Sequence, residues 1–453
     1  MTLCRLKTLC RLKTLCRLKT LCRLKARCRA RPRGWPAVLL AGLVLLVAGA
    51  PGWAAGPDHD ALRKRLAALV DRGTVLVAAA GDAAPFVLGD PHAPWHPASI
   101  LKIATALTAL ETLGAEYRFP TEFYVDDARR LIIRGFGDPF LISEEWRAIA
   151  GTLAAQGVFA APLSGLVLDD SAFPALRVDG VGRSDNPYDA MVAPLVSNFN
   201  TVNVSVAPGG LVTSAEPQTP LTALARELGR ELPAGVHRVN LSLEPGNTLR
   251  YTGELVRAIF ADAGAVISPE VRRGPVPPGA ALVLRHLSSR SLPEVVQAML
   301  KYSNNVIANQ LLLTQDLARH GPPAALDRAA RAATAQLREL TAEADSRVTL
   351  AEGSGISRSN SISAAAMLAL LQRFHPWRHL LSDYVSDGRA APAKTGNLRG
   401  VYTLAGYLPT ADGEGRAFVV LLNQRRNTRA AVFRTLHRAF AEKAPTRNRP
   451  AVE

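Results

Sequence analysis

Strand patterns at both ends of the chain, separated by a long and different middle, constrain the fold more than any other sequence feature. An amphipathic helix pattern over 61–70 is followed by two short strands around a Gly-Asp turn within 73–90. Near the other end, three apolar strand patterns within 391–424 precede a helix from about Thr428 to Glu442. We therefore predict that the two ends are parts of one sheet.

The middle of the chain, from roughly Tyr117 to Arg285, consists of short strands and loops with many Pro and Gly residues. Five segments there have strand character: 121–126, 130–135, 164–173, 200–208 and 239–246. We interpret this region as one or two β-rich inserts before a helical block that starts near Leu292. The predicted organisation is a repeat extension plus signal peptide at 1–54, a catalytic domain formed by 55–116 and 286–445, and the inserted domain or domains at 117–285.

The first 54 residues hold a repeat and an export signal. TLCRLK occurs four times from Thr2 to Lys25, and the five cysteines of the chain all lie in this region: Cys4, Cys10, Cys16, Cys22 and Cys28. Their six-residue spacing fits neither a heptad nor a zinc site, so we interpret the repeat as an artefact of an over-extended reading frame rather than a functional segment. The charge-free stretch 35–50 is typical of a signal peptide cut near Ala54, the alternative being an uncleaved anchor.

The basic balance of the chain depends on these same residues. The formal net charge is +16, but residues 1–54 hold 12 Lys or Arg and no acid, which leaves 54 − 12 = 42 basic against 38 acidic residues, or +4. The charge therefore gives no argument for a nucleic-acid partner. The chain has no phosphate loop and no HExxH pair, and its nine histidines show no ligand spacing, so the sequence predicts no metal and no nucleotide cofactor.

The segment HPASILKIATALTALETLG, 96–114, carries a serine and a lysine at the start of an otherwise apolar helix. Ser99 and Lys102 are one turn apart and share a helical face. Apolar neighbours and the positive end of the helix dipole lower the basicity of an amine, and a neutral amine can act as a base. The alternative is that Ser99 only caps the helix and that the ammonium group of Lys102 reaches solvent.

Two further polar groups follow. Ser303, Asn304 and Asn305 interrupt a run of helix formers, which also suits a simple turn between two helices. Lys394, Thr395 and Gly396 stand where a strand begins, where a cation and a hydroxyl suit a carboxylate and a glycine allows another backbone to come close. The alternative for Lys394 is a strand-edge lysine that prevents aggregation.

Taken together, the three groups occur in an order that resembles the penicillin-recognising serine enzymes. Seven segments make the chain similar to the class C low-molecular-mass penicillin-binding proteins, the D-alanyl-D-alanine carboxypeptidase/endopeptidases: PASILK, GFGDPFL, LVLDDSAF, NFNTVNVSV, LKYSNNVIA, EGSGISRSN and KTGNLRGVYTLAGY. The similarity covers nearly all of the chain after Ala55. It implies an α+β fold, in which an antiparallel transpeptidase-like sheet is flanked by helices and carries the β-rich insert.

The resemblance also implies catalytic roles. Ser99 would attack the carbonyl of a D-Ala-D-Ala peptide, and Lys102 would take its proton. The amides of Ser99 and Asn397 would form the oxyanion hole. Ser303 would pass a proton to the leaving amine, while Asn305 would hold Lys102 and the substrate amide.

The same resemblance implies the substrate contacts. Lys394 and Thr395 would bind the terminal carboxylate, and Gly396 would let the substrate lie along the strand. Arg358 matches an arginine that the family places near the substrate, the alternative being a salt bridge. Asp189 lies in the right part of the insert to meet an amino group of a peptidoglycan side chain, but the match is loose and favours a plain surface loop.

The implied partners are peptidoglycan peptide stems and cross-links and β-lactam antibiotics, with no nucleic acid, and loose membrane association is left open. The implied location is the periplasm. A serine β-lactamase is the nearest alternative, although no Glu-x-x-x-Asn occurs between Asn305 and Lys394. A catalytically idle peptidoglycan-binding protein is another, against which the three intact motifs argue.

A literal Ser-Asp-Asn occurs elsewhere, at Ser184, Asp185 and Asn186, and matches the usual spelling of the second motif better than 303–305 does. Gly182 precedes this triplet and Pro187 follows it, so the chain there is predicted to be a loop of the insert. Because rigid elements hold catalytic groups better than loops do, we predict that Ser303 carries the function.

Overall fold

The computed structural model describes residues 58–79, 85–342 and 347–441. The predictions for the repeats, the cysteines and the signal peptide lie outside these residues. None of the helices in the described part is both long and apolar enough to cross a membrane.

The central sheet has six strands in the order β13-β14-β15-β16-β1-β2, and each neighbouring pair is antiparallel. The strands are β1 (Gly73–Ala78), β2 (Phe86–Leu88), β13 (Asp383–Ser386), β14 (Arg389–Leu398), β15 (Val401–Leu408) and β16 (Arg416–Leu422). Strand β1 pairs with β16, so the two ends of the chain do share one sheet, as predicted. The antiparallel sheet flanked by helices also confirms the predicted α+β fold class.

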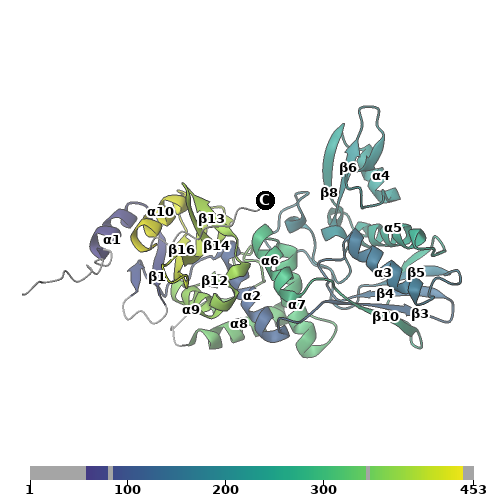
Figure 1. Cartoon of the computed structure of the whole chain (residues 1–453), viewed down its shortest axis with the longest axis horizontal. Coiled ribbons are helices and arrows are strands. Elements are labelled where there is room, and N and C mark those ends of the chain that lie inside the picture. The colour runs from purple at the N-terminus through teal and green to yellow at the C-terminus, as the bar shows by residue number, and fades with distance from the viewer. Residues whose placement is uncertain (1–57, 80–84, 343–346, 442–453) are drawn as a thin grey trace, which may run out of the picture. The chain divides into compact units, whose positions relative to one another are not determined.

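Alternation along the strands gives this sheet two apolar faces. Val420 and Leu422 of β16 pack with α1 (His59–Ala67) and α10 (Arg429–Phe440), whereas Val419 and Leu421 pack with the helices of the opposite face. The helices of the opposite face are α2 (Leu101–Leu113), α6 (Leu292–Tyr302), α7 (Asn305–His320), α8 (Leu326–Leu340) and α9 (Ala364–Phe374). Figure 1 shows α10 and α9 on opposite sides of the sheet.

Helix α2 is the most enclosed element of this core. It packs against α6, α7, α8 and α9, and each of its residues from Leu101 to Leu110 is buried. A helix that is apolar on every side has to be surrounded by other elements, and its few polar side chains then need partners inside the core. Lys102 is one of those buried polar side chains.

A second sheet lies within 117–287 and has the strand order β10-β3-β4-β5-β9. Its strands are β3 (Pro120–Val125), β4 (Arg130–Gly135), β5 (Gly165–Asp169), β9 (Val271–Arg273) and β10 (Ala281–Leu287). Helices α3 (Ser143–Ala155) and α5 (Asn247–Asp262) share its apolar core, so this region holds long helices as well as the predicted strands. The proposed domain boundaries stay a prediction.

A third, three-stranded sheet belongs to the same region. It is formed by β6 (Thr201–Val206), β7 (Val212–Ser214) and β8 (Gly235–Asn240), and helix α4 (Ala223–Arg230) packs on β6 and β7. The strand predicted for 239–246 is wrong over most of its length, because β8 ends at Asn240 and the chain turns into a short 3-10 helix, Leu241–Leu243. The side chain of Asn240 accepts a hydrogen bond from Ser242 N, which favours that turn over an extended chain. The remaining short strands are β11 (Val348–Thr349) and β12 (Ser361–Ile362).

Asp138 is a fully buried carboxyl group just after β4. Its Oδ1 accepts a hydrogen bond from Phe140 N at 2.8 Å, and the side chain of Ser288 lies close to the carboxyl group. Burial raises the pKa of Asp138 to about 7, and the nearby Glu145 acts in the same direction. Between about pH 4 and pH 7 the folded protein therefore retains a proton that the unfolded chain has lost.

We predict that Asp138→Asn stabilises the protein more at pH 8 than at pH 4. The raised pKa contributes stability at low pH that is lost as the pH rises through about 7, and an uncharged amide has no such loss. From pH 4 to pH 8, the unfolding free energy of the variant minus that of the parent should increase by an amount on the order of 2–4 kcal/mol. Thermal or urea unfolding at the two pH values measures it, with the exposed Asp127→Asn as the control. A difference that does not change with pH contradicts the prediction.

Candidate active site

Ser99 lies in a 3-10 turn, η1 (Ala98–Ile100), that leads directly into α2, so the predicted position near a helix start is confirmed. The residue before it, Ala98, has a φ of 48°, a left-handed conformation that costs a non-glycine residue energy. The backbone of Gly355 packs directly against this residue, because a Cβ on Gly355 would lie only 2.0 Å from the Ala98 carbonyl oxygen. The backbone just before Ser99 is therefore closely packed.

Lys102 is completely buried beneath Ser99. Its Nζ lies 3.0 Å from Ser99 Oγ, 2.8 Å from Asn305 Oδ1 and 2.9 Å from the Ser354 carbonyl oxygen. Burial lowers the pKa of Lys102 well below its usual range, and the positive charge of Lys394 lowers it further. A neutral amine donates two hydrogen bonds, to Asn305 and Ser354, and its lone pair then faces Ser99 Oγ.

Ser303 and Asn305 lie where α6 gives way to α7, so the predicted turn between helices is confirmed. Ser303 ends α6 with a φ of 52°, and the side chain of Asn304 caps α7 by accepting a hydrogen bond from Ile307 N at 3.0 Å. Asn305 Oδ1 accepts from Lys102, and its Nδ2 donates to the Tyr188 carbonyl at 3.1 Å. Asn305 thereby ties the lysine to the loop that contains Tyr188.

Strand β14 brings Lys394, Thr395 and Gly396 beside the serine turn. A Cβ on Gly396 would lie 2.2 Å from Thr403 Oγ1 and 2.8 Å from Ser99 N, so only glycine allows this approach. This close contact with another backbone confirms the reasoning from the strand glycine. Lys394 is buried, and burial together with Arg429 lowers its pKa to about 8.

These residues surround a cleft of about 370 Å³. The lining residues are Ser99, Tyr188, Asp189, Tyr302, Ser303, Asn305, Ile356, Thr395, Asn397 and Leu398. Five of the predicted site residues thus share one cavity, although they come from three separate parts of the sequence. Lys102 and Lys394 do not line the cleft, but Lys102 contacts two of its lining side chains, and Lys394 Nζ donates to the Thr395 carbonyl at 3.0 Å.

Arg358 does not line this cleft. Its guanidinium donates to the Arg399 carbonyl at 2.7 Å, and its side chain lines a different cavity together with His96 and Gly400. The contact is with a backbone carbonyl and is no salt bridge. A substrate contact by Arg358 stays a prediction.

The literal Ser-Asp-Asn triplet serves its own loop. Ser184 Oγ donates to Asp189 Oδ2 at 2.5 Å, and Asp185 Oδ1 accepts from Asn240 N at 3.1 Å. Asp189 itself is buried and lines the cleft, so it does not belong to a plain surface loop. Its other oxygen accepts a hydrogen bond from Gly182 N at 3.2 Å, which leaves the carboxylate engaged in holding the loop.

Glu352 is a residue of this site that sequence reasoning did not single out. Its buried carboxylate accepts hydrogen bonds from Ser354 N at 2.7 Å, Gly355 N at 2.7 Å, Asn309 Nδ2 at 2.9 Å and Asn360 Nδ2 at 2.7 Å. It thereby fixes the peptide whose carbonyl accepts from Lys102. An acid directly before a Gly-Ser-Gly run is the sequence signal, because small residues leave their amides free to converge on one carboxylate.

We predict that Glu352→Gln slows acylation of Ser99 by more than tenfold and moves the acidic limb of its pH profile to lower pH. The amide nitrogen that replaces one carboxylate oxygen accepts no hydrogen bond, so either Ser354 N or Gly355 N loses its acceptor and the Ser354 peptide shifts. The lost negative charge also removes an interaction that raises the pKa of Lys102. The pH profile of acylation by a penicillin measures both effects.

The matched control for this variant is Glu339→Gln, which changes an exposed carboxylate in α8. If Glu352 had a purely structural role, Glu352→Gln would lower the acylation rate without moving the acidic limb of the pH profile. An acidic limb that stays in place therefore contradicts the prediction.

Metal ligation has no candidate in the ranges that the structure describes, since no three His, Cys, Asp or Glu side chains there are grouped to hold an ion.

The family model of the D-Ala-D-Ala carboxypeptidase 3 (S13) family matches residues 68–230, 226–386 and 377–442. The chain is 30% identical over 398 residues to a D-alanyl-D-alanine carboxypeptidase of Actinomadura sp. (strain R39), covering 72% of this chain and 73% of the relative. It is 26% identical over 387 residues to the D-alanyl-D-alanine carboxypeptidase DacB of Haemophilus influenzae, covering 72% and 80%.

The fold is also similar to a solved structure, the crystal structure of penicillin binding protein 4 (dacB) from Haemophilus influenzae. The TM-score is 0.65 at 20% sequence identity, and the match covers 84% of this chain and 98% of that one. A second structure of that protein, complexed with a novel β-lactam, matches with a TM-score of 0.61 over the same shares of the two chains.

Proposed function

This chain belongs to the D-Ala-D-Ala carboxypeptidase 3 (S13) family and is a serine-type D-Ala-D-Ala hydrolase, and we propose that it cleaves peptidoglycan peptides through an acyl-enzyme on Ser99. The single observation that carries this proposal is the buried Lys102 amine, 3.0 Å from Ser99 Oγ and held by Asn305. An amine of lowered pKa next to a hydroxyl is what activation of a serine requires.

In the acylation step Lys102 Nζ takes the proton of Ser99 Oγ as the oxygen attacks the carbonyl carbon of the penultimate D-alanine. The carbonyl oxygen becomes an oxyanion, which the amides of Ser99 and Asn397 stabilise. When the C–N bond breaks, the Ser303 hydroxyl gives its proton to the leaving nitrogen. Lys102 then gives to Ser303 the proton that it took from Ser99. The product is an ester on Ser99 and a free amine.

The substrate is held by the strand side of the cleft. We assign its terminal carboxylate to Lys394 and Thr395, since a cation and a hydroxyl suit a carboxylate. Asn305 holds the substrate amide while it keeps Lys102 in place. In the second step a water gives a proton to Lys102 as its oxygen attacks the acyl carbon. The bond from that carbon to Ser99 Oγ then breaks, Lys102 returns the proton to Ser99 Oγ, and the peptide leaves as a carboxylic acid.

A β-lactam acylates the same serine, and a fast β-lactamase would need a carboxylate free to activate water. Asp189 lines the cleft, but both of its oxygens accept hydrogen bonds from Gly182 and Ser184. This arrangement favours slow release of the acyl group, as in a penicillin-binding protein. The connected network of Ser99, Lys102 and Asn305 argues against a catalytically idle protein.

The location follows from the sequence ahead of the described residues. We propose that the apolar segment 35–50 acts as a signal peptide that directs export to the periplasm and is removed by cleavage near Ala54. In the periplasm, peptidoglycan stems and cross-links are the partners of the protein. The small net charge of the remaining chain supports at most loose association with a membrane surface.

We predict that a fluorescent penicillin labels the parent protein at Ser99 and fails to label Ser99→Ala. Ser303→Ala should lower the acylation rate by roughly 10²–10⁴-fold, as expected for a lost proton-transfer group, whereas Ser184→Ala should change it less than about threefold. Stopped-flow acylation rates of the three variants provide the measurement. Labelling that persists in Ser99→Ala, or a severe loss confined to Ser184→Ala, would overturn the assignment.

We predict a bell-shaped pH profile for kcat/KM of penicillin acylation. The rate should rise where Lys102 loses its proton, below the usual lysine range, because the base must be neutral. It should fall above a pH of about 8, where Lys394 loses the charge that binds the carboxylate. In Lys394→Gln the rate should be lower throughout and the alkaline limb should vanish. A rate of the parent that keeps rising to pH 10 contradicts these roles.

A further inference from the structure

A second cavity, of about 530 Å³, opens beside the catalytic cleft. The two share Tyr188 and Tyr302, whose side chains are 42% and 65% exposed. Its other lining residues include Phe140, Phe199, Asn203, Glu216, Arg238 and Asn304. The cavity therefore adjoins the cleft and is larger than it.

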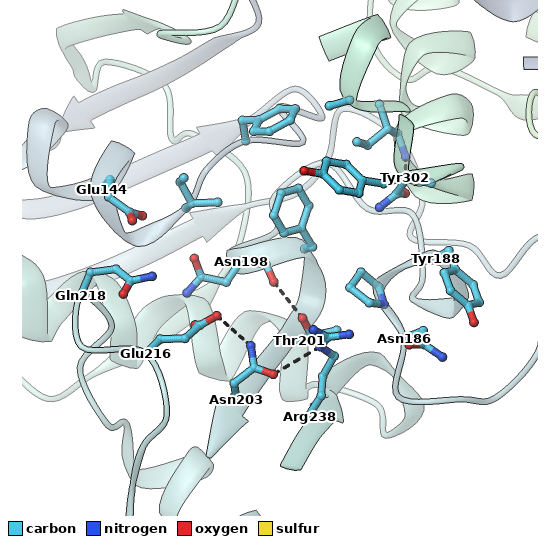
Figure 2. A pocket seen from close by; sticks show the side chains of 17 residues that line it. Glu144, Asn186, Tyr188, Asn198, Thr201, Asn203, Glu216, Gln218, Arg238 and Tyr302 are labelled. Atoms are coloured by element: carbon cyan, nitrogen blue, oxygen red, sulfur yellow. Dashed lines mark hydrogen bonds between the residues drawn. The ribbon is translucent and has the colours of Figure 1, made fainter. Parts of the chain in front are cut away.

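The walls of this cavity combine apolar rings with both signs of charge. Figure 2 shows Tyr302 on one side and Glu216, Asn203 and Arg238 on the other. Asn203 Nδ2 donates to Glu216 Oε1 at 2.7 Å, and Arg238 Nε donates to Asn203 Oδ1 at 3.3 Å. Among the residues that the structure describes, Arg238 forms no ion pair. Amides, a guanidinium and carboxylates together suit a peptide that carries free carboxylate and ammonium groups.

The apolar wall is maintained at an energetic cost. Asn198, Phe199 and Asn200 have φ values of 48°, 58° and 57°, and the left-handed conformation is especially unfavourable for Phe199. The Asn198 side chain anchors this turn by accepting from Ser143 N at 2.9 Å and donating to Tyr251 Oη at 3.0 Å. The ring of Phe199 packs edge-on against Phe140, with centroids 5.5 Å apart. Strain that the surroundings enforce beside a reaction site points to a binding role.

The position of the cavity relates it to the leaving group. Ser303, which we assigned to protonate the leaving amine, lies between Tyr302 and Asn304, and both of these line the cavity. A leaving group longer than one residue that extends past Ser303 on this side would therefore reach the cavity. A single released alanine would occupy only a small part of it.

We propose that this cavity binds the leaving-side peptide of a cross-linked pair of stems, and that Arg238 binds one of its carboxylates. The inference rests on the proposed function and extends it, since it makes cross-linked peptides a substrate that the protein recognises on both sides of the scissile bond. Contacts with the leaving stem add binding energy only when that stem is present.

We predict that Arg238→Ala lowers kcat/KM for a sugar-free, cross-linked peptide dimer roughly tenfold, mainly through KM, as expected for one lost charge-assisted hydrogen bond. Release of D-alanine from the uncross-linked pentapeptide and acylation by a penicillin should stay within about twofold of the parent. The control is Arg226→Ala, which changes another exposed arginine of the same region that does not line the cavity. Mass spectrometry of the products gives both peptide rates.

The outcomes separate this inference from the proposed function. If Arg238→Ala leaves cleavage of the dimer unchanged, or lowers dimer and monomer cleavage equally, the cavity does not bind the leaving stem. A defect seen only with substrates that retain their sugars overturns the peptide assignment in favour of a glycan. If the parent cleaves neither peptide and resists penicillin, the proposed function itself fails.

Discussion

A fully buried lysine amine is the constraint on which the rest of this structure depends. Charged, Lys102 would carry a large desolvation cost, and neutral, it still needs partners for its two N–H groups. Asn305 and the Ser354 carbonyl supply these partners, and each comes from a different element. The start of α2, the start of α7 and the loop after β11 must therefore meet at one point. Glu352 holds that loop by accepting from its amides.

Two lysines in one site have different environments, and the difference separates their tasks. Burial lowers the pKa of both, but that of Lys394 stays at about 8, so it is mostly charged at neutral pH. Its positive charge in turn lowers the pKa of Lys102. One amine is thus kept available as a base while the other remains a cation for a carboxylate, and the two roles support each other.

Several backbone positions around the cleft adopt conformations that cost energy. Ala98 precedes the nucleophile, Ser303 ends α6, and Phe199 forms a wall of the adjoining cavity, all with positive φ. Neighbouring contacts hold such conformations, as the approach of Gly355 to Ala98 shows. Because rigid placement of reacting groups lowers the barrier of a reaction, conformational strain at these positions is consistent with function.

Local sequence patterns determined the elements that carry the site. The start of the serine helix, the turn at Ser303 and the strand that contains Gly396 were all predicted correctly, because periodicity and turn chemistry act over a few residues. The pairing of the two chain ends was predictable for a related reason, since strand patterns at both ends imply a shared sheet. The motif order then allowed a family resemblance, which the match to the S13 family bears out.

Only the tertiary structure decided which side chains meet. It brought Ser99, Asn305 and Ser354 within 3.0 Å of one nitrogen, and it directed Arg358 to a different cavity. It also revealed Glu352, whose five partners are separated from it by 2, 3, 5, 8 and 43 residues. Such contacts depend on how helices and sheets pack against one another, and packing is a property of the whole chain that no short stretch of residues contains.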